Sequence, residues 1–260
     1  MEKSINKVNI KPRKIFPGLL GAIGLIALLL LIQLIGAFII SYIPKNGQIA
    51  FLLLIQTISL VVPISLGIKI SKRNIKEIIP FKRVKASTTL ISIVAIFAID
   101  IICVNAASFL PASWLDTSAA DFIDSTSIVF ILLIFVIVAP IMEELLYRGV
   151  ILSGFQKRYH IWPAIILVSV LFGLSHLNIP QFFTTTIIGI FLAWLVYHTN
   201  SLRASMACHV FNNLWLIATA KYLPILAIYI SKLWISLIFL VIGSIAIFLL
   251  AEQFKRKPIL

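Results

Sequence analysis

Two adjacent glutamates, two histidines and an asparagine are the residues of this chain whose types and spacing could do chemistry. Glu143 and Glu144 stand together in an apolar stretch, and Arg148 follows Glu144 by four residues. Residues four apart share one face of a helix, so Glu144 and Arg148 can form an ion pair. Glu143 projects about 100° away around the helix. It is left as a free carboxylate, which suits general acid or base work.

Two histidines occupy other apolar stretches of the chain. His176 follows Phe172 by four residues at the end of one stretch, and His209 precedes Asn213 by four in another. His209 and Asn213 therefore share a helix face, one turn apart. A single buried histidine is most often a satisfied core residue, and the charged pair alone could serve only to hold helices together. The whole set, within about seventy residues of apolar sequence, favours one functional site.

The composition indicates what kind of protein positions these residues. Of 260 residues, 61% are hydrophobic and 12% are charged, whereas soluble domains are about half apolar and about one-quarter charged. We therefore expect an all-α polytopic membrane helix bundle, formed as a single membrane-embedded domain over residues 1–260. The net charge of +13 lies in short clusters between apolar runs, which is typical of contact with anionic lipid headgroups. A basic stripe interleaved with aromatic residues is missing from the sequence, which argues against nucleic-acid binding.

Eight apolar stretches approach the length of a membrane span, for which about 20 residues are needed. We predict about eight transmembrane helices, at 16–43, 49–70, 86–110, 127–152, 162–177, 182–197, 204–220 and 233–250. The segment 69–85 carries seven basic residues and one acid, while 111–126 carries three aspartates and no base. The positive-inside rule then predicts a multi-pass plasma-membrane protein with both termini in the cytoplasm.

The depths of the polar residues in these helices are not equal. Straight helices would place His176 about 10 Å farther from the cytoplasmic side than Glu143 and His209, at about 1.5 Å per residue. We therefore expect tilted or broken helices around a water-filled cavity, since irregular backbone in a membrane is tolerated where it lines a cavity.

The three patterns resemble the motifs of the CAAX protease and bacteriocin-processing family of intramembrane peptidases. They occur in the family's order on separate predicted helices, as Glu143-Glu144-x-x-x-Arg148, Phe172-x-x-x-His176 and His209-x-x-x-Asn213. The resemblance covers about 127–220 and implies a catalytic core there. It also implies cleavage of a membrane-associated peptide or protein that enters from the membrane, in bacteria for peptide maturation or bacteriocin self-immunity. Glu144 and Arg148 would form a supporting ion pair.

The resemblance implies a role for each of the other motif residues. Glu143 and His176 would activate the attacking water, and His209 and Asn213 would donate hydrogen bonds to the oxyanion of the tetrahedral intermediate. Amide hydrolysis needs such a base and such donors. A mechanism without a cofactor is favoured. The alternative is a zinc ion held by Glu143, His176 and His209 with water as fourth ligand, although the sequence has no HExxH motif.

Other polar residues in the apolar stretches have simpler explanations. The sequence around Ser175 has Leu177 in place of the final glycine of a GxSxG motif, so a serine-peptidase nucleophile is not indicated. Cys208 points about 100° away from its neighbour His209 on a helix, so the two do not form a Cys–His pair. We expect Asp100 to be a hydrogen-bonded interior residue, and threonines 184–186 to bond to backbone or neighbouring helices. The alternative functions are a non-catalytic immunity protein and a proton-coupled transporter. A transporter would more often have paired halves with matching broken helices, and the sequence shows no internal repeat.

Overall fold

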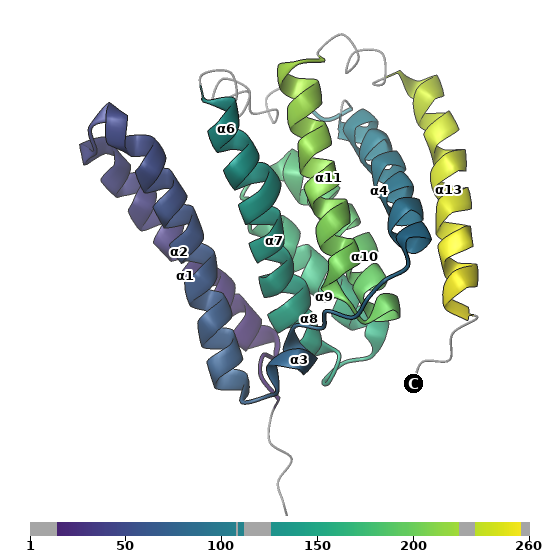
Figure 1. Ribbon diagram of the computed structural model, residues 1–260, viewed down its shortest axis with the longest axis horizontal. Coiled ribbons are helices and arrows are strands. Elements are labelled where there is room, and N and C mark those ends of the chain that lie inside the picture. The colour runs from purple at the N-terminus through teal and green to yellow at the C-terminus, as the bar shows by residue number, and fades with distance from the viewer. Residues whose placement is uncertain (1–14, 108, 112–125, 224–231, 256–260) are drawn as a thin grey trace, which may run out of the picture.

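The structure is a bundle of roughly antiparallel helices (Figure 1). It is a computed structural model that describes residues 15–107, 109–111, 126–223 and 232–255. In chain order the helical elements are α1 (Leu19–Ile39), η1 (Ile40–Tyr42), α2 (Lys45–Ser71), α3 (Ile75–Ile78), α4 (Ala86–Ala107), α6 (Ile128–Ile131), η3 (Leu132–Val138), α7 (Ala139–Glu144), η4 (Leu145–Ile151), α8 (Leu152–Phe155), α9 (Ile161–Leu174), α10 (Ile179–Thr199), α11 (Leu202–Lys221) and α13 (Leu233–Lys255). The prediction of an all-α polytopic bundle is confirmed.

Six of the described helices are long and apolar enough to cross a membrane. They are Leu19–Tyr42, α2, α4, the continuous helix Ile128–Phe155, α10 and α13. Helices α9 and α11 also coincide with predicted stretches. However, α9 has only 14 residues, about 21 Å of helix, and α11 is not apolar enough to be among the six. The count of eight crossings therefore stays a prediction.

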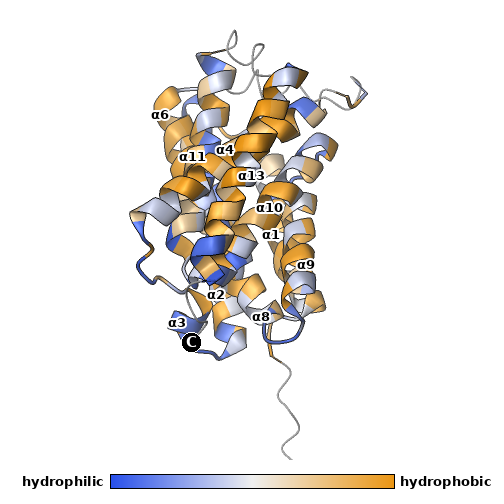
Figure 2. Cartoon of the chain, turned by 90° about the vertical axis from the view of Figure 1, so that its right-hand side faces the viewer, coloured by the Kyte–Doolittle hydropathy of each residue, from blue (hydrophilic) through white to orange (hydrophobic). Residues whose placement is uncertain are grey.

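Hydrophobic residues predominate in the helices over much of the height of the bundle (Figure 2). Large hydrophobic side chains are exposed along the outer helices α1 and α13, for example Leu34, Phe38, Val241 and Phe248. A contiguous apolar surface of this kind suits contact with lipid rather than with water. Beneath it, one buried cluster joins α1 and α2 to η4, α9 and α10, and another joins α4 and α10 to α11 and α13.

One end of the bundle holds α3, α8, the start of α1 and the end of α13 (Figure 1). The basic segment 69–85 is at this end, and the acidic segment 111–126 lies almost wholly outside the described residues, Ser118 included. If the basic end is cytoplasmic, a cysteine introduced for the exposed Lys76 should resist an impermeant thiol reagent in intact cells. A cysteine replacing the exposed Ser127, before α6, should react. Labelling with the opposite pattern would reverse the orientation predicted from charge.

The helix that carries the glutamates is irregular on both sides of them. The segments η3 and η4, which flank α7, are π-helical. The N–H of Ala139 donates to the Ile134 carbonyl, five residues back. In that register the next donor would belong to residue 140, but Pro140 has no N–H. Single π-helical turns occur frequently at functional sites. The tilted or broken helices around a water-filled cavity, expected from the unequal depths of the polar residues, stay a prediction.

Local polar contacts set where α11 begins, and so where His209 lies. The Ser201 side chain caps the helix by accepting a hydrogen bond from the Arg203 N–H, as serine often does at this position. Its hydroxyl also donates to the Lys82 carbonyl over 2.6 Å, and the Leu202 N–H donates to the Pro80 carbonyl over 2.9 Å. The basic segment is thereby fastened to the start of α11, seven residues before the histidine.

Candidate active site

The most deeply buried part of the site is the ion pair predicted from the spacing of α7. A guanidinium nitrogen of Arg148, Nη1, lies 2.8 Å from Oε1 of Glu144, and both side chains are fully buried. The guanidinium also lies over the Phe172 ring, 4.5 Å from its centre, and donates to the Gly189 carbonyl over 3.4 Å. A Cβ at Gly189 would stand 3.3 Å from Arg148 Nη2 and 3.1 Å from Ser169. Glycine therefore lets α10 approach the arginine closely.

The imidazole of His209 lies between the two glutamates. Its Nδ1 is 3.0 Å from Oε1 of Glu144, and its Nε2 is 3.7 Å from Oε2 of Glu143. A carboxylate paired with Arg148 can only accept hydrogen bonds, so Nδ1 of His209 carries the donated proton. The Glu143 side chain is 20% exposed, whereas that of Glu144 is fully buried. Glu144 is therefore buried and its charge is compensated by Arg148, whereas Glu143 is partly exposed beside His209. Helices α7 and α11 lie side by side (Figure 1).

His176 lies in the turn after α9 rather than in the helix, because α9 ends at Leu174. Its Nδ1 is 2.9 Å from the Phe172 carbonyl, an acceptor, so Nδ1 is again the donor and Nε2 keeps its lone pair. The Phe172 ring meets the His176 ring edge-on at 5.0 Å and the His209 ring at 5.8 Å between centres. Both imidazole rings therefore pack against the ring of the same phenylalanine, Phe172. Among the described residues, His176 makes no ion pair with a carboxylate.

The amide of Asn213 is held by the irregular helix. Its Nδ2 donates to the Phe135 carbonyl over 2.8 Å. In the π-helical register of η3, each N–H donates to the carbonyl five residues back, so residue 140 would donate to Phe135. Pro140 has no N–H and leaves this carbonyl to another donor. An amide nitrogen has two N–H groups. One bond to Phe135 therefore orients Asn213 and leaves a second N–H to donate.

The proposed zinc ligands do not form a ligand group. Within the described part of the chain, no three His, Cys, Asp or Glu side chains are close enough together to hold a metal ion. Glu143 and His209 are neighbours, but His176 is turned to the Phe172 carbonyl. We therefore derive no step of the chemistry through a metal.

The other polar residues mostly take the structural positions expected of them. Cys208 is buried in the apolar cluster of α4, α10, α11 and α13. Thr184 and Thr185 bond to backbone carbonyls one turn back, whereas the buried hydroxyl of Thr186 has no partner among the described residues. Asp100 is buried, at 3% exposure, and its expected hydrogen bond stays a prediction.

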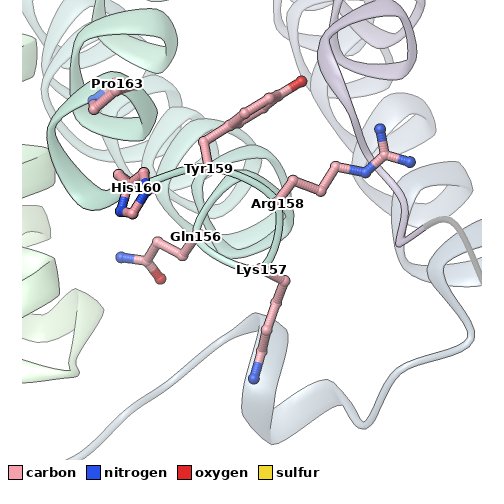
Figure 3. A pocket seen from close by; sticks show the side chains of 6 residues that line it. All are labelled: Gln156, Lys157, Arg158, Tyr159, His160 and Pro163. Atoms are coloured by element: carbon pink, nitrogen blue, oxygen red, sulfur yellow. The ribbon is translucent and has the colours of Figure 1, made fainter. Parts of the chain in front are cut away.

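A shallow surface hollow at the end of α8 lies apart from these residues. It is lined by Gln156, Lys157, Arg158, Tyr159, His160 and Pro163. Their side chains point in different directions from the turn (Figure 3), so no polar groups converge on a ligand. Arg158 instead donates from Nε to the Ile15 carbonyl over 2.6 Å, which ties this turn to the segment before α1.

The comparisons with known proteins point to the same part of the chain. Residues 125–215 match a family model described as type II CAAX prenyl endopeptidase, Rce1-like. The matched segment contains all three motifs, from Glu143 to Asn213. Neither a curated protein nor a solved structure is significantly similar to this chain.

Proposed function

We propose that this chain is an intramembrane endopeptidase that uses water activated by Glu143 and His176, and the match of residues 125–215 to the Rce1-like type II CAAX prenyl endopeptidase model supports this proposal. The observation that carries the proposal is the position of His209. It bridges an enclosed glutamate at 3.0 Å and an open glutamate at 3.7 Å. The substrate class is a hydrophobic, membrane-associated peptide or protein, and the site lies in the cell membrane of a multi-pass chain with cytoplasmic ends.

In the first step, water attacks the carbonyl carbon of the scissile peptide bond. Glu143 takes a proton from this water, and Nε2 of His176 accepts its hydrogen bond, since Nδ1 of His176 is already committed to Phe172. The new C–O bond turns the carbonyl oxygen into an oxyanion. The second N–H of Asn213 and a protonated Nε2 of His209 donate to it.

In the second step, the tetrahedral intermediate expels the amine. The C–N bond breaks, and the proton held by Glu143 moves to the leaving nitrogen, which restores the carboxylate. Glu144 does not exchange protons in this scheme. Its carboxylate stabilises a positive charge on His209 through Nδ1, while Arg148 keeps Glu144 ionised through their contact at 2.8 Å. The buried ion pair thus stabilises the positively charged His209 that donates to the oxyanion, and it does not act on the attacking water.

Cleavage by the purified protein is the direct test. We expect turnover of at least one member of a panel of hydrophobic peptides, with and without a prenylated C-terminal cysteine, in detergent or proteoliposomes. Mass spectrometry of the products locates the cleaved bond. Turnover should survive treatment with a chelator that removes bound metal, because within the described part of the chain no three His, Cys, Asp or Glu side chains are close enough together to hold a metal ion. Loss of turnover on chelation, restored by zinc, would contradict the metal-free scheme and leave the peptidase assignment standing.

A proton-coupled transporter remains the rival function, since carriers also hold acids and histidines inside their bundles. The same proteoliposomes distinguish the two. Proton-driven uptake of a peptide without cleavage, together with an intact panel after prolonged incubation, would reject the peptidase proposal. A non-catalytic immunity protein would give neither uptake nor cleavage.

A further inference from the structure

A cavity at the basic end of the bundle is not used by the proposed chemistry. Its volume is about 410 Å³, and small-molecule sites commonly measure about 300–1,000 Å³. Its walls come from the segment 77–83, from η4 and α8, and from the ends of α10 and α13. Arg148, which also belongs to the candidate active site, forms part of its lining. The cavity therefore reaches the buried ion pair from the basic end.

The charges on the walls of this cavity are mostly positive. Lys82, Arg83 and Arg148 supply three cations, whereas Glu77 is the single acid among the described residues that line it. Glu144 compensates Arg148 from the side of the candidate active site, at 2.8 Å. Lys82 and Arg83 are exposed and still outnumber Glu77, so a positive charge remains in excess. This excess favours an anionic ligand.

Arg148 also offers a donor that the protein leaves without an acceptor. The residue is 1% exposed. Its Nη1 contacts Glu144 and its Nη2 donates to the Gly189 carbonyl, but its Nε has no hydrogen-bond partner among the described residues. An unpaired buried donor is unfavourable. The guanidinium fork matches the spacing of phosphate oxygens, so a phosphate group in the cavity would supply the missing acceptor.

Contacts within the protein hold the walls in place without a ligand. The Lys82 carbonyl accepts a hydrogen bond of 2.6 Å from the start of α11. Arg73 donates to the carbonyl and the hydroxyl of Ser153, over 3.0 Å and 2.9 Å. Where α10 meets α13, the His198 ring stacks on the Phe254 ring, with 4.8 Å between centres and 3° between planes. A preformed cavity of this kind loses little conformational freedom when a ligand binds.

The position of the cavity indicates where a phosphate group would come from. Three helices that are long and apolar enough to cross a membrane end around it: Ile128–Phe155, α10 and α13. Such ends lie where the hydrocarbon core gives way to the polar headgroups. Basic pockets between transmembrane helices at this level bind the phosphates of anionic lipids. A lipid headgroup can therefore reach this cavity directly from the bilayer.

We propose that the cavity binds a phosphate group, supplied by the headgroup of an anionic phospholipid or by free phosphate. Lys82 and Arg83 attract the anion at the exposed end, and Arg148 donates to it from Nε at the buried end. This site is separate from peptide cleavage, because neither Lys82 nor Arg83 has a part in the proposed chemistry. Its occupancy can be measured without any peptide.

Lipid binding to the purified, delipidated full-length chain tests the site. Native mass spectrometry measures the affinity of the first bound lipid, for anionic phosphatidylglycerol and for zwitterionic phosphatidylcholine. We expect phosphatidylglycerol to bind more tightly. Lys82→Gln combined with Arg83→Gln should weaken its binding about 10- to 30-fold, since each basic residue near an anionic lipid contributes to attraction. Both side chains are exposed, so the unfolding temperature without lipid should stay at the parent value.

Lys76→Gln combined with Lys85→Gln is the matched control. It removes the same charge from the same exposed basic segment, but neither lysine lines the cavity. Its affinity should stay within about two-fold of the parent value, because exposed charges outside a site are largely screened by salt. An equal loss in both double variants would overturn the proposal, since it would show general attraction of anionic lipid to a basic surface. Unchanged affinity in the Lys82→Gln, Arg83→Gln variant would overturn it too.

Inorganic phosphate distinguishes the two sources of the ligand. The unfolding temperature of the delipidated protein is compared in phosphate and in chloride at equal ionic strength. A saturable rise in phosphate that is lost in Lys82→Gln, Arg83→Gln, without preference for phosphatidylglycerol, assigns the cavity to free phosphate. A response to phosphatidylglycerol alone assigns it to the lipid. A protein that responds to neither probe rejects the phosphate site, whether or not it cleaves peptides.

Discussion

Glu143→Gln is expected to abolish peptide cleavage while leaving expression and folding near normal. The glutamine side chain is nearly isosteric and cannot take a proton from water. Loss of a general base typically lowers the rate about 10²- to 10⁴-fold. Folding should survive because the Glu143 side chain is 20% exposed, and its 3.7 Å separation from Nε2 of His209 is longer than a hydrogen bond. Turnover of a peptide substrate and the thermal unfolding curve measure the two expectations.

Two further variants show whether the loss of cleavage in Glu143→Gln is specific to the catalytic water. His176→Ala should lose activity to a similar extent, because its Nε2 is assigned to the same water. Glu77→Gln is the matched control: it makes the same chemical change at an exposed acid in α3, and we expect parental turnover. Activity retained within a few-fold in Glu143→Gln would place the base elsewhere, with Glu144 the next acid to examine.

The helical elements were the most predictable part of this chain. Apolar stretches of about 20 residues dictate helices in a bilayer, and α1, α2, α4, α10 and α13 coincide with predicted stretches within a few residues. The boundaries near the site were less predictable. Leu174 ends α9 three residues before the predicted end, so His176 lies in a turn. An apolar run does not reveal this, since Leu177, which has a left-handed φ of 52°, is as hydrophobic as its helical neighbours.

The site was predictable to the extent that its contacts follow helical spacing. The pair Glu144 and Arg148 is four residues apart and forms the expected contact. Contacts between helices have no such signal. Spacing gave no hint that His209 lies between two glutamates, or that the Phe172 ring contacts the rings of both histidines. They follow from how α7, α9 and α11 pack.

One such contact could have been suspected from the chain itself. A proline in a helix interior removes an N–H and leaves a carbonyl that needs another donor. Pro140 stands three residues before the glutamate pair, in a stretch that must stay helical to cross the membrane. A donor other than residue 140 is therefore expected nearby, and Asn213 supplies one at the Phe135 carbonyl. The carbonyl that Pro140 leaves without a helical donor depends on the π-helical register of η3, and this register cannot be predicted from the sequence.

Glu144→Gln is expected to destabilise the protein by about 3–5 kcal/mol, as when one partner of a buried ion pair is removed. The Glu144 and Arg148 side chains are fully buried, so the arginine would keep an uncompensated charge in an apolar interior. Poor insertion and a lower unfolding temperature in detergent are the measurable results. Glu252→Gln is the matched control, because it removes the charge from an ion pair with Lys255 whose side chains are 34% and 72% exposed. Such exposed pairs contribute about 0–1 kcal/mol.

A double variant separates the structural role of this ion pair from its role in catalysis. Glu144→Leu combined with Arg148→Met replaces both buried charges by apolar side chains, which is often neutral for stability. We expect most of the lost stability to return. Turnover should not return, because Nδ1 of His209 loses the carboxylate that it contacts at 3.0 Å, and a positive charge on that imidazole is no longer stabilised. Normal stability of Glu144→Gln with no turnover would instead make Glu144 a direct participant in the proton transfers. Full turnover of the double variant would remove both residues from the mechanism.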